Sequence, residues 1–321
     1  MRIGELCSYA PKSTIKAGEA VDGAKYMFFT SSADESKRYT EYQYDGEGII
    51  MGTGGNATLH YYSGKYAVST DCVVLVPRGN IRCKYLYYFL KANISVLEAG
   101  FKGAGLKHTN KKYISDIDVN TVPDFCKQDE IIAILDKLNA VINSRKEELQ
   151  LLEDLVSARF VEMFGDPIRN THNRHTTEFS NVVKMQRGFD LPVQARQRCG
   201  DIPVYGSNGV LDYHNVAKIQ GGGVITGRSG TIGKVFYTEG DYWPLNTSLF
   251  SVDTHGNNVI YLAYLLQMFD LSRFVEGTGV PTLNRNMFHD KQIIDVSRYE
   301  QEQFADFVKQ VDKSKSMQQY I

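Results

Sequence analysis

Residues 223–237 read GVITGRSGTIGKVFY, and residues 48–62 read GIIMGTGGNATLHYY. Both stretches have an apolar lead-in, a Gly-x-x-Gly core and an aromatic exit. A Walker A loop would need Gly, four residues and then Gly-Lys-Ser/Thr, so that backbone N–H groups wrap phosphates and the hydroxyl holds magnesium. Arg228 stands where the first glycine is needed, and Val235 stands where the hydroxyl is needed. The stretch therefore indicates half of an internal repeat and not a nucleotide site.

Two further pairs of segments follow in the same order. FKGAGLKHTNKKYISDIDV at residues 101–119 matches VEGTGVPTLNRNMFHDKQIIDV at residues 275–296, with Gly103, Gly105 and Asn110 over Gly277, Gly279 and Asn284. Before each lies a helix-like segment, YLYYFL or YLAYLL, which follows a strand-like run, CVVLV or SLFSV. A period this long predicts tandem duplication of a whole mixed α/β (α+β) domain.

A long helix is expected after each globular unit. Residues 128–164 carry an apolar heptad seam over four heptads, which is typical of helix-on-helix packing, and Gly165-Asp166-Pro167 ends it. The second helix is shorter and more polar, and it aligns with the first at an offset of 172. The pattern predicts globular domains at 1–124 and 166–297, a spacer helix at 125–165 and a short coiled-coil-forming helix at 298–321.

Composition excludes several classes of protein. Lys+Arg number 36 against 37 Asp+Glu, so the chain has no overall positive charge that would indicate nucleic-acid binding. Any surface that binds nucleic acid must therefore be local. The five cysteines form neither a CxxC pair nor a Cys/His cluster with metal-ligand spacing. No signal-peptide core and no run of about eighteen apolar residues is present. These features predict a reduced cytoplasmic protein with no metal, no cofactor and no contact with a membrane.

The combination resembles the specificity (S) subunit of type I restriction-modification enzymes. The resemblance covers the whole chain and rests on LVSARFVEMFGDP (155–167), IPVYGSNGVLDYHN (202–215), ITGRSGTIGKV (225–235) and PLNTSLF (244–250), in this order, together with the duplication around a helix. It implies two target-recognition domains, each reading one half of a split site in double-stranded DNA. It also implies methyltransferase subunits docked on the helices and a motor-endonuclease subunit that joins for cleavage.

Chemistry by the chain itself is not expected. The sequence lacks an Asn/Asp-Pro-Pro-Tyr/Phe motif for adenine methylation and a glycine-rich S-adenosylmethionine motif between strand and helix. Asp166-Pro167 has neither the second proline nor the aromatic residue that stacks a flipped base. The chain is therefore expected to be a non-catalytic recognition subunit.

Base readout needs Arg, Lys, Asn or Gln on a rigid frame, whereas phosphates are contacted by cations, hydroxyls and backbone N–H groups. Such residues gather in the repeated loops of both domains. In the second domain the candidates are Arg187, Ser207, Asn208, Arg228, Ser229, Thr231, Lys234, Thr282, Asn284 and Arg285. In the first domain they are Thr53, Asn56, Lys107, His108, Asn110, Lys111 and Lys112.

Structural explanations compete with DNA contact at these positions. The glycines at 227, 230 and 233 suit a tight turn between strands, and Asn208 before Gly209 suits a hairpin. The run from Lys107 to Lys112 is also consistent with a solvated surface. Its alignment with Asn284 and Arg285 favours contact.

The second helix departs from the family pattern because it ends before any counterpart of residues 150–164. On this basis the apolar side chains at the end of the first helix lack an intramolecular partner, and helices of a partner subunit or a second copy are expected to cover them. The residues concerned are Leu152, Val156, Phe160 and Met163.

Two other functions remain open at the level of sequence. The chain could serve another bipartite restriction or methylation system, since the same architecture suits more than one. It could also be a coiled-coil scaffold whose α/β domains bind protein or carbohydrate, which the near-neutral charge favours.

Overall fold

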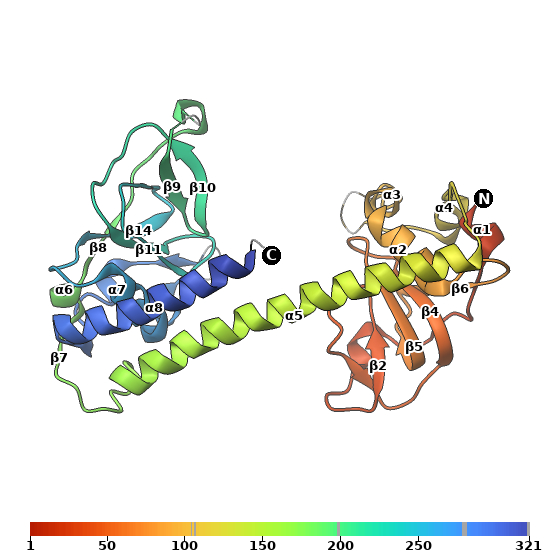
Figure 1. Cartoon of the computed structure of the whole chain (residues 1–321), viewed down its shortest axis with the longest axis horizontal. Helices are drawn as coiled ribbons and strands as arrows, with labels where there is room; N and C mark the ends of the chain where they lie inside the picture. The colour runs from red at the N-terminus through yellow and green to blue at the C-terminus, as the bar shows by residue number, and fades with distance from the viewer. Residues whose placement is uncertain (104, 106, 198–199, 278–280, 320–321) are drawn as a thin grey trace. The chain divides into compact units, whose positions relative to one another are not determined.

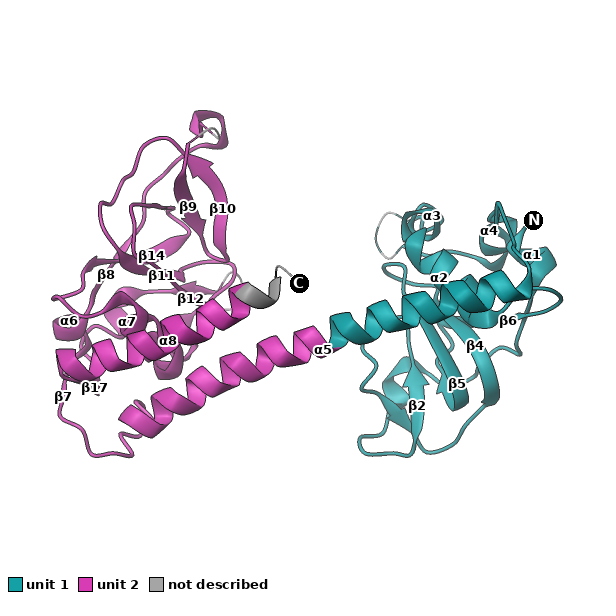
Figure 2. Ribbon diagram, viewed as in Figure 1, with its two compact units in different colours: residues 1–143 teal, residues 144–321 magenta. Residues whose placement is uncertain are grey.

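The structure, a computed structural model, describes residues 1–103, 105, 107–197, 200–277 and 281–319 (Figure 1). Gly279 lies outside the described residues. The chain divides into two compact units, residues 1–143 and 144–321 (Figure 2). Each unit combines helices with β-sheet, so the expected α+β class is confirmed. The long helix α5 (Phe125–Phe164) contributes its first half to unit 1 and its second half to unit 2.

Unit 1 is built on one six-stranded sheet in the order β1-β6-β4-β5-β2-β3. Its strands are β1 (Cys7–Tyr9), β2 (Tyr26–Phe29), β3 (Arg38–Tyr39), β4 (Tyr44–Gly52), β5 (Leu59–Val68) and β6 (Cys72–Pro77). Its helices are α1 (Ile3–Leu6), η1 (Ala17–Glu19), α2 (Cys83–Ala92), α3 (Ile94–Glu98) and α4 (Lys111–Asp116). The main core lies where α1, α2 and α4 meet the sheet, because Ile3, Leu86 and Ile114 are all fully buried there.

Unit 2 contains a four-stranded sheet, a three-stranded sheet and two short ribbons. Its strands are β7 (Thr176–Glu178), β8 (Lys184–Arg187), β9 (Ile202–Gly206), β10 (Gly209–His214), β11 (Gly223–Gly227), β12 (Val235–Thr238), β13 (Trp243–Pro244), β14 (Ser248–Asp253), β15 (Val275–Glu276), β16 (Thr282–Leu283) and β17 (Gln292–Ile294). Its helices are α6 (Phe179–Val182), η2 (Val193–Ala195), α7 (Val259–Phe269), η3 (Leu271–Phe274), η4 (Arg285–Met287) and α8 (Arg298–Gln319).

The two units share a sheet topology that matches the sequence repeat. In unit 1 the strand order is β1-β6-β4-β5, and in unit 2 the corresponding order is β8-β14-β11-β12. The central strands β4 and β11 are the two apolar lead-ins, and each ends at the glycine that opens the repeated loop. The predicted duplication is therefore confirmed for four strands of each unit.

A buried glutamine anchors the helix that follows each domain. The side-chain oxygen of Gln128 accepts the backbone N–H of Arg82 at 2.7 Å, and that of Gln301 accepts the N–H of Asn258 at 2.9 Å. Each side-chain nitrogen donates to the carbonyl oxygen five residues earlier in the chain. Because this geometry sets the helix register, the offset between the helices is 173 (301 − 128) and the expected 172 is wrong.

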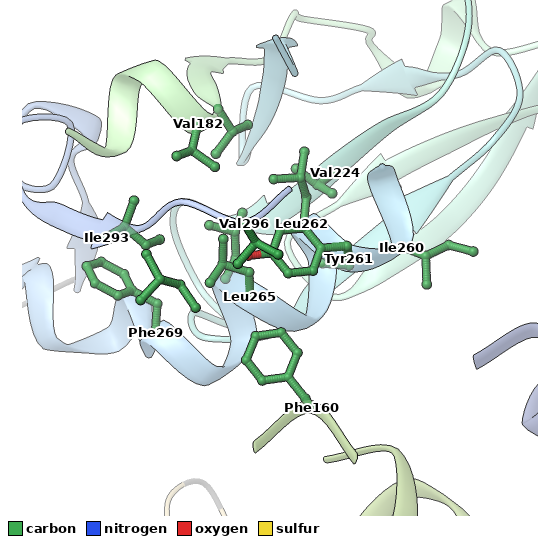
Figure 3. Close-up of a cluster of buried hydrophobic side chains, with 14 of the residues drawn as sticks. Phe160, Val182, Val224, Ile260, Tyr261, Leu262, Leu265, Phe269, Ile293 and Val296 are labelled. Atoms are coloured by element: carbon green, nitrogen blue, oxygen red, sulfur yellow. The ribbon is translucent and has the colours of Figure 1, made fainter. Parts of the chain in front are cut away.

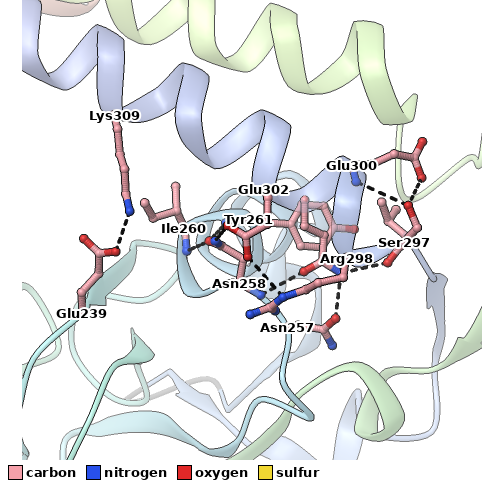
Figure 4. Close-up of polar contacts among 12 residues, drawn as sticks. Glu239, Asn257, Asn258, Ile260, Tyr261, Ser297, Arg298, Glu300, Glu302 and Lys309 are labelled. Atoms are coloured by element: carbon pink, nitrogen blue, oxygen red, sulfur yellow. Dashed lines mark hydrogen bonds and ion pairs between the residues drawn. The ribbon is translucent and has the colours of Figure 1, made fainter.

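Further polar contacts hold α8 against the start of α7 (Figure 4). Asn258 donates its side-chain amide to Glu302 at 2.9 Å, while its side-chain oxygen caps α7 by accepting the N–H of Ile260. Near the middle of α8, Lys309 reaches Glu239 at 2.9 Å. The helix is thus fixed to unit 2 at its start and near its middle.

The end of α5 packs inside unit 2, contrary to the expectation from the sequence. Val156 and Phe160 are fully buried, and Leu152 and Met163 pack against the same cluster. Phe160 reaches into the side chains of α7, where its ring stacks on Tyr261 at 6.0 Å (Figure 3). The prediction that these four side chains lack an intramolecular partner is wrong.

The reason is that α8 is long enough for the task. It runs antiparallel to the last part of α5 (Figure 1), and its Phe304 lies 5.4 Å from the ring of Phe160. The seam residues Val308 and Val311 of α8 are buried in the same cluster. The helix therefore covers the second half of α5 without any counterpart of residues 150–164.

Candidate nucleic-acid interface

The loop after β11 is a glycine-rich turn at one end of the four-stranded sheet. A Cβ at Gly227 would overlap the carbonyl oxygen of Thr231 and would lie 2.8 Å from that of Ser207, so only glycine lets these backbone segments approach. Gly230 and Gly233 have φ of +84° and +93°, in the left-handed region that favours glycine. These glycines let the loop turn tightly against its neighbours, which suits a frame for side chains that read DNA.

The β9–β10 hairpin turn lies against this loop. The ammonium of Lys234 donates to the side-chain oxygen of Asn208 at 2.9 Å, and a Cβ at Gly230 would lie 3.4 Å from the hydroxyl of Ser207. Asn208 and Lys234 are both exposed. Two segments whose contacting residues are 26 positions apart thus present polar groups together.

Strand β16 closes the cluster from the other side. Ser229 forms an isolated antiparallel bridge with Thr282, and the N–H of Leu283 donates to the carbonyl oxygen of Arg228 at 2.8 Å. Arg228 is half-buried, and one of its guanidinium nitrogens donates to the carbonyl oxygen of Asn246 at 3.4 Å. A guanidinium carries five N–H donors, so this contact orients the group without exhausting it.

Arg187 belongs to the same end of the sheet. It pairs with Leu249 on β14, next to the pair formed by Ser248 and Gly227. Because these strands are neighbours, the exposed Arg187 side chain and the glycine loop start from adjacent positions. The structure therefore brings together the predicted residues from four separate segments of unit 2.

Unit 1 repeats this arrangement. Gly54 forms an antiparallel bridge with His108, as Ser229 does with Thr282. The N–H of Thr109 donates to the carbonyl oxygen of Thr53 at 3.0 Å, as Leu283 does to Arg228. Both bridges join positions that the repeat aligns. The glycine loop and the later polar segment therefore lie side by side in each unit.

Some predicted residues have local structural roles. The side-chain oxygen of Asn110 caps α4 by accepting the N–H of Tyr113, and that of Asn284 caps η4 by accepting the N–H of Asn286. The half-buried Arg285 donates to the carbonyl oxygen of Met185 at 3.4 Å. The conformation of these three side chains is set by the fold, which limits how they can meet a ligand.

Positive side chains at the start of α4 oppose the helix dipole. Lys111 and Lys112 are its first two residues, and both are exposed. A cation at a helix N-terminus is unfavourable by roughly 0.3–1 kcal/mol. For Lys111 this unfavourable interaction is partly offset, because its ammonium lies 4.8 Å from the centre of the Tyr9 ring. Lys107 and Asn56 are also exposed, and both lie close in sequence to the bridged residues Gly54 and His108.

The sequence missed Lys12, which lies far from the repeated loops along the chain. It lines a cavity of about 180 Å³ together with Thr53, Asn110 and Lys111. The segment after β1 has no clear match in the second half of the chain, so the repeat gave no signal for it. The positive cluster of unit 1 thus includes a residue from a third segment.

The described ranges hold no group of three or more His, Cys, Asp and Glu side chains placed for a metal ion. Among the described residues, no helix has the length and apolar character needed to cross a bilayer.

Comparison with known proteins places the chain in one family. The family described as "Type I restriction modification DNA specificity domain" matches residues 1–154 and 176–320. The chain is 25% identical over 156 residues to the "Type I restriction enzyme EcoDI specificity subunit" of Escherichia coli, covering 49% of this chain and 34% of that protein. It is 21% identical over 295 residues to the "Putative type I specificity subunit S.MpnORF507P" of Mycoplasma pneumoniae, covering 87% of this chain and 78% of that protein.

The fold also has a solved relative. The S subunit of a type I restriction-modification system from M. genitalium superposes with a TM-score of 0.67 at 14% identity, over 99% of this chain and 90% of that one. At this identity the likeness shows the fold alone. The match to the Escherichia coli protein spans about a third of that protein's length.

Proposed function

Because the chain belongs to the family of type I restriction modification DNA specificity domains, we propose that it reads DNA sequence for a restriction-modification system of that type. The observation that carries the proposal is the duplicated loop. The same bridge between glycine loop and polar segment occurs as Gly54–His108 in unit 1 and Ser229–Thr282 in unit 2. Two similar loop clusters in one chain suit a target with two halves.

Each unit would read one half of the target from its loop cluster. In unit 2, the exposed Arg187 and the oriented guanidinium of Arg228 are the groups best suited to base edges, because Arg can donate two parallel hydrogen bonds to guanine. In unit 1, Lys107, Lys111 and Lys112 are suited to phosphates. These clusters supply the local positive charge that the net charge of −1 conceals.

Protein partners would carry out the chemistry. Methyltransferase subunits would dock on α5 and α8, and a motor-endonuclease subunit would join for cleavage. The chain itself would hold the complex on its target without making or breaking bonds. The match to "specificity subunit" proteins supports this division of labour.

Salt dependence of DNA binding separates this function from that of a protein or carbohydrate scaffold. Phosphate contacts release condensed counterions, so the affinity for duplex DNA should fall steeply and linearly on a logarithmic scale as salt rises. The measurement is fluorescence anisotropy of labelled duplex with the assembled complex at several salt concentrations. Absence of binding at low salt would reject DNA recognition.

Two substitutions distinguish base contact from phosphate contact. Arg228→Ala should cost about 1–3 kcal/mol on the mapped target and relax specificity at one position, because a bidentate donor is lost. Lys112→Ala should weaken all duplexes alike and make the salt dependence shallower, because only a phosphate contact is lost. Competition between target and scrambled duplexes measures both effects. If neither change alters binding, these residues belong to the general surface.

A further inference from the structure

The first half of α5 carries an apolar stripe that unit 1 leaves open to solvent. Ile134, Leu138, Val141 and Ile142 are exposed by 51%, 53%, 58% and 50%. Their spacing of four, seven and eight residues places them on one face of the helix. We call these four residues the α5 stripe. Contiguous apolar surface of this kind marks an interaction site more often than isolated exposed residues do.

The helix packs on unit 1 through a different face. Asp129 pairs with Arg82 at 2.9 Å, Asp136 pairs with Lys84 at 2.7 Å, and the amide of Asn139 donates to the hydroxyl of Tyr88 at 3.1 Å. These contacts hold α5 against α2 and leave the α5 stripe on another side. The stripe is therefore not needed for the attachment of the helix to its own unit.

In the second half of the same helix, the apolar seam is covered by another helix. There the seam side chains Val156 and Phe160 are fully buried against the antiparallel helix α8. The α5 stripe continues that seam toward the N-terminus. An antiparallel helix is thus the kind of occupant that this surface accepts.

The composition of the stretch also points to burial. Residues 131–143, IIAILDKLNAVIN, contain only two charged residues, and Asp136 is already paired with Lys84. Little charge on this face would therefore have to be desolvated by a partner. An exposed helix surface that stays in water usually carries a much higher proportion of charge.

The stripe is self-complementary. Ile134 and Ile142 lie four residues before and four residues after Leu138. Two identical antiparallel helices related by a two-fold axis at Leu138 would place Leu138 on Leu138 and Ile134 on Ile142, with one ridge packed beside the other. We propose that the α5 stripe is an isologous docking surface for a second copy of this chain. This inference does not depend on DNA recognition.

Oligomeric state tests the proposal. The full chain should show a monomer–dimer equilibrium in sedimentation velocity as its concentration rises through the micromolar range. Leu138→Asp should weaken self-association at least tenfold, because a charge would be placed on the two-fold axis. Leu151→Asp is the matched control, since Leu151 is 68% exposed on the same helix outside the stripe. It should associate like the unchanged chain, and circular dichroism should show both variants folded.

Cysteine cross-linking tests the geometry. With the exposed Cys126 changed to Ser, Leu138→Cys should give a covalent dimer in oxidised glutathione, which takes up the two electrons and two protons released as the thiols join. Leu151→Cys should not. A chain that stays monomeric at every concentration, or a dimer that survives Leu138→Asp, overturns the proposal. Binding of a methyltransferase subunit alone at this stripe would also overturn it, by assigning the surface to that partner.

Discussion

Phe160→Ala is expected to lower the free energy of unfolding of unit 2 by about 3–5 kcal/mol, because it leaves a cavity in a closely packed cluster. The Phe160 side chain is fully buried. Its ring lies 4.9 Å from Phe164, 5.4 Å from Phe304 and 6.0 Å from Tyr261, so one truncation removes contacts to both α7 and α8.

Urea denaturation followed by tryptophan fluorescence measures this effect in one unit. The chain has a single tryptophan, Trp243, and it lies on β13 in unit 2. Leu151→Ala is the control and should change the free energy by less than about 0.5 kcal/mol, because this side chain is mostly in solvent. A loss below about 1 kcal/mol for Phe160→Ala would contradict the packing of α5 within unit 2.

Gly227→Ala is expected to abolish the reading of one half-site. The added methyl group would overlap the carbonyl oxygen of Thr231 and crowd that of Ser207, and neither backbone atom is free to move like the end of a side chain. Overpacking of this kind costs typically 1–3 kcal/mol and shifts the loop that carries Arg228. Recognition by unit 1 should persist.

The control is Gly240→Ala, since nothing lies within 4 Å of the added atom there. Binding of duplexes altered in one half-site or the other measures the effect. Unchanged discrimination in both halves after Gly227→Ala would show that the loop does not form part of the interface.

The sequence predicted the fold well where the repeat supplied two copies of the same evidence. The glycine loops, the strands that lead into them and the later polar segments align by a nearly constant offset, and the structure pairs them in the same way. A duplicated segment must satisfy the same backbone geometry twice, so its glycines and apolar positions are read with more certainty than those of a single segment.

The helix contacts could not be predicted because they depend on tertiary packing. The seam on α5 is continuous in sequence, yet it is covered by α8 at Phe160 and left open at Leu138. The roles of individual side chains could not be predicted from the sequence for the same reason. Asn110 and Asn284 align as candidate contacts, but alignment does not reveal that both side chains cap helices. Lys12 approaches the unit 1 cluster from a segment outside the repeat.

Each unit is expected to read one half of a split target. Co-expression of the chain with methyltransferase subunits of a type I system, followed by mapping of methylated adenines by sequencing, shows whether this is so. A second chain, in which residues 167–296 are replaced by the matching segment of a related specificity subunit, is mapped in parallel. The expected motif has two short halves separated by a gap, of which one half changes and the other survives the exchange. A continuous motif, or an exchange that alters both halves, would contradict it.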